Sequence, residues 1–78
     1  MTTDGDDWRD ALPGVWLGPD GEKVTCVEKL KVLEENLGEI AELAQDALED
    51  AILMGVGEDQ ARQTLAGVIT RLNNPYKK

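Results

Sequence analysis

Residues 25–54 read TCVEKLKVLEENLGEIAELAQDALEDAILM, and this is the longest stretch of the chain that can form a single helix. Thr25 and Glu28 have the spacing of a capping box, in which side chains and backbone amides pair at the start of a helix. Gly55 follows the stretch and can adopt left-handed backbone angles, as in a Schellman motif. The pattern predicts one helix over residues 25–54, with Gly38 as its one clearly unfavourable residue.

Apolar residues recur along this predicted helix at alternating steps of four and three, which places them on one face. They are Cys26, Leu30, Leu33, Leu37, Ile40, Ala44, Ala47, Ala51 and Met54. A helix in water gains most of its stability by packing its apolar side, so this face must be covered. We call it the apolar seam and expect the rest of the chain to pack against it.

A second, shorter helix is predicted over residues 58–73. It opens with Glu58 and Asp59, whose negative charges suit the first turn of a helix, and Pro75 prevents its continuation. An apolar stripe runs along it, formed by Ala61, Thr64, Leu65, Val68, Ile69 and Leu72. Because only about three residues separate the two helices, they must form a roughly antiparallel or steeply angled pair. The predicted fold class is all-α, an antiparallel helical hairpin.

The segment before the long helix divides into a leader and a turn. Residues 1–10 are polar, acidic and without periodicity, so we expect a flexible leader, followed by a single small helical domain over residues 11–78. Residues 18–21 read Gly-Pro-Asp-Gly, which suits a type I turn with proline at its second position. The short runs on either side of this turn form either a small β-hairpin or an ordered loop.

Part of the apolar seam lies beyond the reach of the shorter helix. This part consists of Leu30, Leu33, Leu37 and Ile40. The residues before the long helix, with Trp8 and Trp16, can cover it, and so can a second copy of the chain. Since 78 residues with one cysteine form a small core without a disulfide, we expect a homodimer in which four helices pack together.

The residue types present exclude most catalytic chemistry. The chain has no histidine and no serine, which removes Ser–His and Cys–His nucleophiles and the serine that carries the arm of an acyl carrier protein. Zinc, di-iron and calcium-loop motifs are also absent from the sequence. Cys26 is either a reactive thiolate in the first helical turn or, as its seam position favours, a buried apolar residue. We expect a protein that is not an enzyme and binds no cofactor or metal.

The overall charge limits the classes of partner. Sixteen acidic and eight basic residues give a net charge of −8, which repels phosphate backbones and anionic lipid head groups. We therefore expect no direct binding to nucleic acid or membranes. No stretch has the length and apolar character of a membrane span, and the residues after Met1 do not resemble a signal peptide. A cytoplasmic protein is predicted.

Acidic residues are concentrated on the long helix. Nine acidic residues and no basic ones lie between Val32 and Ala61. Five of them step by four and three and form an acidic stripe beside the seam: Glu35, Glu39, Glu42, Asp46 and Glu49. Like charges at this spacing destabilise a helix by roughly a few tenths of a kcal/mol per pair. The stripe is therefore either a docking face for a basic partner or a solvated face that maintains solubility.

These features together favour a small non-enzymatic accessory, adaptor or regulatory protein that homo-oligomerises and binds a protein partner. Trp8 and Trp16 are the candidate anchors of that interface, and the acidic stripe is its candidate charged rim. The alternative is an acidic regulator, similar in role to an antitoxin, that masks a basic nucleic-acid-binding or nuclease surface.

Overall fold

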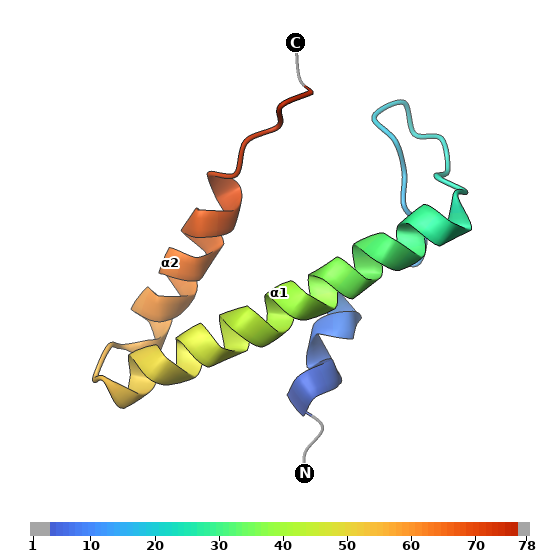
Figure 1. The fold of residues 1–78 in the computed structure, drawn as a ribbon. Coiled ribbons are helices and arrows are strands. Elements are labelled where there is room, and N and C mark those ends of the chain that lie inside the picture. Colours follow the sequence, from blue (N-terminus) through green and yellow to red (C-terminus); the bar gives the residue numbers. More distant parts are fainter. Residues whose placement is uncertain (1–3, 77–78) are drawn as a thin grey trace. The chain divides into compact units, whose positions relative to one another are not determined.

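The computed structural model describes residues 4–76, and these residues form helices joined by loops (Figure 1). In chain order the elements are the 3-10 helix η1 (Asp4–Ala11) and the α-helices α1 (Val27–Leu53) and α2 (Glu58–Thr70). No strand occurs in the described range, so the predicted all-α helical hairpin of one long and one shorter helix is confirmed. The shorter helix ends three residues earlier than predicted, at Thr70.

The contacts within the chain divide it into two compact units, Met1–Glu42 and Leu43–Lys78. The first unit contains η1, the loop that follows it and the first part of α1. The second contains the rest of α1 and all of α2. The boundary between the two units lies inside the long helix. The leader over residues 1–10 and the single domain over residues 11–78 stay predictions. Residues 1–3 of the predicted leader and residues 77–78 at the other end lie outside the described part of the chain.

The start of α1 differs from the predicted capping box. The helix begins at Val27, and the amide of Leu30 donates to the carbonyl of Cys26 at 2.9 Å. Cys26 is therefore the residue that precedes the helix. Among the described residues no hydrogen bond joins Thr25 to Glu28, so the predicted capping box is wrong. The helix starts too late for the Thr25 side chain to reach its first free amides.

The end of α1 is a Schellman motif, as the sequence predicts. The amide of Val56 donates to the carbonyl of Ala51 at 2.9 Å, and the amide of Gly55 donates to the carbonyl of Ile52 at 3.0 Å. Gly55 has a φ of 98°, in the left-handed region that favours glycine. The chain then enters α2 with Gly57 in extended conformation at the N-cap position.

The segment between η1 and α1 is an ordered loop and not a β-hairpin. Its one pairing in the described part is an isolated antiparallel bridge between Leu17 and Lys23. The predicted turn is present, because the amide of Gly21 donates to the carbonyl of Gly18 at 3.0 Å and Gly21 has a φ of 85°. Glycines bound the run 15–17, which leaves too few residues for a strand.

Burial is slight throughout the described residues. Ala61 of α2 is the one hydrophobic side chain there that is buried, with 7% of its surface exposed. In the first unit Leu30, Leu33 and Leu37 are half-buried, whereas Ile40 is 44% exposed. Neither α-helix in the described part has both the length and the apolar character needed to cross a membrane.

Candidate partner-binding site

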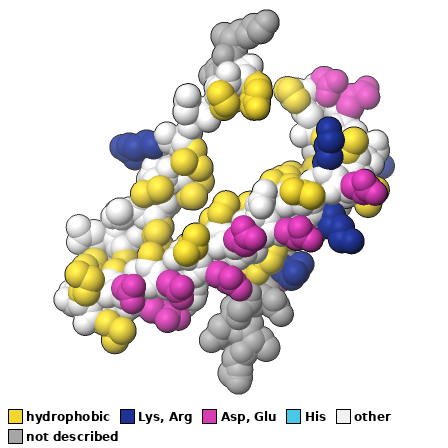
Figure 2. All heavy atoms as spheres, viewed as in Figure 1, with side chains coloured by type: hydrophobic (Ala, Val, Ile, Leu, Met, Phe, Trp, Pro, Cys, Tyr) yellow, Lys and Arg dark blue, Asp and Glu magenta, His cyan; other side chains and the backbone are white. Residues whose placement is uncertain are grey.

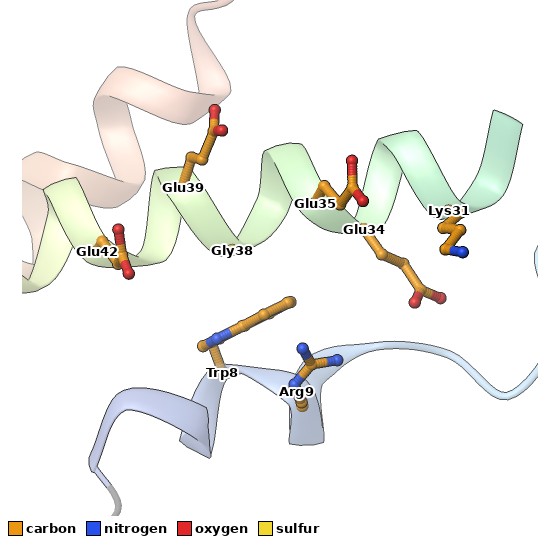
Figure 3. A pocket seen from close by; sticks show the side chains of 8 residues that line it. All are labelled: Trp8, Arg9, Lys31, Glu34, Glu35, Gly38, Glu39 and Glu42. Carbon is orange, nitrogen blue, oxygen red and sulfur yellow. The ribbon is translucent and has the colours of Figure 1, made fainter. Parts of the chain in front are cut away.

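Trp8 lies against α1 at Gly38, within the first unit (Figure 3). A Cβ atom placed on Gly38 would lie 3.0 Å from Cζ2 of Trp8 and 3.5 Å from its Cη2. The shorter distance is below the separation of about 3.5–4.0 Å at which carbon atoms pack best. The glycine that is unfavourable for the helix therefore provides the space in which the indole ring lies.

The 3-10 helix η1 holds Trp8 in this place. At the end of η1 the amide of Leu12 donates a hydrogen bond to the carbonyl of Arg9 at 3.1 Å. Trp8 and Leu12 are both half-buried. They are apolar side chains in a polar segment, and their burial indicates that both face the rest of the first unit. The sequence leaves open whether Trp8 packs on its own chain or on a partner. In the structure it packs on its own helix, and part of its surface remains exposed.

Arg9 adds a second contact to the indole. The carbon of its guanidinium group lies 4.7 Å from the centroid of the Trp8 ring, which is within the range of a cation–π interaction. At a site with this much solvent such a contact contributes about 0.5–1 kcal/mol. Trp8 is thus held both by packing on Gly38 and by a neighbouring cation.

An open hollow lies beside Trp8 on the surface of α1. It is lined by Trp8, Arg9, Lys31, Glu34, Glu35, Gly38, Glu39 and Glu42. Figure 3 shows that these side chains come from η1 and from successive turns of α1, with Glu34 extending to the η1 side and Glu39 extending away from it. The residues that line the hollow are therefore one tryptophan, four glutamates, two basic residues and a glycine, and the carboxylate of Glu39 points away from Trp8.

The hollow contains four of the predicted partner-binding residues. Trp8 and three residues of the acidic stripe line it together, and those three, Glu35, Glu39 and Glu42, are all exposed. The remaining two stripe residues belong to the second unit.

The other predicted partner-binding residues do not line this hollow. Asp46 is exposed on α1, and Glu49 accepts a hydrogen bond from Nε2 of Gln45 at 2.8 Å. Trp16 is half-buried in the loop, and its Nε1 atom is buried without a hydrogen-bond partner in the described structure. A buried and unpaired N–H group costs about 1–3 kcal/mol. The indole N–H of Trp16 therefore lowers the stability of the fold that buries it.

Sequence reasoning misses four residues of the hollow. Arg9, Lys31 and Glu34 show no pattern that distinguishes them from other charged residues of the chain. Gly38 does carry a signal, since it is a lone glycine in a sequence otherwise rich in helix formers. A glycine of this kind indicates that another group approaches the helix closely, and Trp8 is that group.

Cys26 is exposed, so the expectation that it is a buried seam residue is wrong. It precedes the first residue of α1, and its side chain therefore does not continue the apolar face of the helix. Across residues 4–76 no three cysteine or acidic side chains are grouped in a way that could hold a metal ion.

The hollow has the chemistry to receive a cationic side chain. Exposed carboxylates accept charge-assisted hydrogen bonds from arginine or lysine, and an indole face adds apolar and cation–π contact. Lys31 and Arg9 line the same hollow and offset part of its negative charge. Comparisons with family models, with curated proteins and with solved structures found no match to this chain.

Proposed function

We propose that this protein is a small non-enzymatic adaptor or regulatory protein that homo-oligomerises and binds a basic protein partner at the Trp8 hollow. One observation carries the proposal: a half-exposed tryptophan and three exposed glutamate residues of the acidic stripe line the same open hollow. Aromatic residues surrounded by charged ones are typical of protein–protein interfaces, where the ring provides affinity and the charges provide specificity.

The distribution of charge supports a basic partner. Residues 1–42 contain eleven acidic and four basic residues, a net charge of −7 out of the total of −8. A field of this sign attracts a basic surface and raises its association rate, and the effect falls as salt screens the charges. A partner that is itself a nuclease or a nucleic-acid-binding protein would fit the same surface, and the protein would then mask it. The proposed compartment is the cytoplasm.

Trp16 is not part of the proposed interface. Its Nε1 atom is buried, and it does not line the hollow. The proposed contact surface is therefore narrower than the sequence predicts: Trp8 with Glu35, Glu39 and Glu42, while Asp46 and Glu49 extend the acidic stripe along α1.

The test is affinity capture of partners from native cell extract, followed by binding kinetics of the captured protein in a series of salt concentrations. The variant replaces Glu35, Glu39 and Glu42 with glutamine. The control replaces Glu22, Glu28 and Glu58, which removes the same total charge outside the hollow. We expect the hollow variant to slow association about tenfold and to flatten its salt dependence, because steering charges act chiefly on the association rate. Equal slowing by both variants, or a partner that is acidic, would refute the proposal.

A further inference from the structure

The indole ring of Trp8 has a neighbour from its own chain on each side. A Cβ atom on Gly38 of α1 would lie 3.0, 3.5 and 3.8 Å from three atoms of the ring. The guanidinium carbon of Arg9 lies over the ring at 4.7 Å from its centroid. Figure 3 shows the indole between these two groups, with α1 on one side and Arg9 on the other. Both faces of the ring are therefore occupied within the first unit.

The face that Arg9 covers is the one that a cation from a partner needs. A cation is attracted to the face of an indole, which carries negative potential, and not to its edge, which carries positive potential. Since α1 blocks one face at Gly38, the other face is the one that a partner can reach. A cationic side chain of a partner contacts the ring there only after Arg9 has moved away.

The contact of Arg9 with the ring is weak enough to be exchanged. Arg9 is exposed, and its guanidinium group lies at the end of a long side chain with many rotatable bonds. A cation–π contact at an exposed site changes an equilibrium constant by about two- to fivefold. A partner that brings its own cation, together with other contacts, can therefore displace Arg9.

The remaining charges of the hollow act on either cation. The four glutamates that line the hollow attract the side chain of a partner and that of Arg9 alike. Figure 2 shows acidic side chains along α1. Lys31 also lines the hollow, but in the described part of the chain the cation placed over the Trp8 ring is Arg9 and not Lys31. The two basic residues therefore differ in their contact with the ring and agree in their charge.

We propose that Arg9 is an internal competitor for the Trp8 hollow, and that a basic partner binds by displacing the Arg9 guanidinium from the indole face. The inference rests on the proposed function and adds the regulation of the same site. In the free protein Arg9 covers the ring, and the affinity for a basic partner is lower by about two- to fivefold than it would be without this contact.

The experiment measures binding of a short, capped oligoarginine peptide to the full chain with Arg9→Gln. The control Lys31→Gln removes the same charge from the same hollow and leaves the ring contact in place. NMR titrations follow the indole N–H resonance of Trp8, which is identified by its absence in a Trp8→Leu chain. We expect Arg9→Gln to bind the peptide about two- to fivefold more tightly than Lys31→Gln, because only the first change uncovers the ring.

A Trp8→Leu background shows whether the ring causes this difference. In that background Arg9→Gln and Lys31→Gln should bind the peptide equally, as followed by the backbone amides of α1. Far-UV circular dichroism and nuclear Overhauser contacts between Trp8 and Gly38 show that each variant with the tryptophan keeps its helices and its packed indole. Arg9→Lys is the second variant. It keeps the charge, loses the planar group that stacks on an aromatic ring, and should also bind more tightly than the wild type.

The outcomes separate this inference from the proposed function. Equal affinities of the Arg9→Gln and Lys31→Gln chains would overturn the inference alone, and so would weaker binding by Arg9→Gln than by the wild type. A peptide that binds none of the chains would overturn the hollow as a cation-binding site, and the inference with it. The same holds for a peptide that binds unchanged after Glu35, Glu39 and Glu42 are replaced by glutamine.

Discussion

Replacement of Gly38 by alanine has two opposing effects of similar size on the free energy of unfolding. Alanine is better than glycine in a helix interior by about 1 kcal/mol, so the change alone should stabilise α1. The new Cβ atom, however, would lie 3.0 Å from Cζ2 of Trp8, and the indole would have to retreat by about 0.5–1 Å to reach ordinary packing distance.

The cost of that retreat can be estimated from the burial of Trp8. Removal of a fully buried tryptophan side chain costs about 3–5 kcal/mol, so a half-buried one contributes about 2 kcal/mol. A displacement of the indole by about 0.5–1 Å removes a quarter to a half of the attraction of its contacts. The packing contribution of Trp8 would therefore fall by roughly 0.5–1 kcal/mol. Gly38→Ala should therefore leave the free energy of unfolding nearly unchanged in the wild-type chain and raise it by about 1 kcal/mol in a Trp8→Ala chain.

The assay is urea unfolding followed by far-UV circular dichroism for the wild type, both single variants and the double variant. Gly67→Ala in α2 is the matched control, because its Cβ atom would meet only Nη1 of Arg71, at 3.1 Å, the mobile end of a long side chain. It should gain about 1 kcal/mol whether or not Trp8 is present. If Gly38→Ala gained as much as Gly67→Ala in both backgrounds, the indole would not rest on Gly38 in solution.

Two further substitutions test local features of the helices. Gly55→Ala should lower the free energy of unfolding by about 1–2 kcal/mol, because Gly55 has a φ of 98° and other residues adopt such angles only with strain. Gly14→Ala, which has open space around it and no left-handed φ, should change it by less than about 0.5 kcal/mol, and thermal unfolding that ranked the two in the opposite order would contradict the Schellman geometry. Arg62→Gln removes a 2.8 Å ion pair with Glu58 in which both side chains are more than half exposed. It should cost no more than about 0.5 kcal/mol at low salt and nothing measurable at high salt; a loss that persisted at high salt would show a role beyond the ion pair.

Local patterns in the sequence predict several parts of this fold correctly. Gly55 takes the left-handed position after α1, and the predicted turn at residues 18–21 forms before α1. Each of these depends on hydrogen bonds between residues at most five apart, so nearby residue types are sufficient to specify them. The predicted pair of Thr25 with Glu28 is the exception, because the helix begins only after Cys26.

The sequence by itself determined that the protein is a hairpin of one long and one shorter helix, that its chain is strongly acidic, and that an acidic stripe runs beside an apolar seam. Only the tertiary structure decided which distant residues meet and which apolar side chains stay exposed. Trp8 and Gly38 meet although they are thirty residues apart, and Leu72 stays exposed although it continues the stripe of the buried Ala61. Periodicity identifies which side chains need cover, but the segment that provides it depends on how the connecting loops direct the chain.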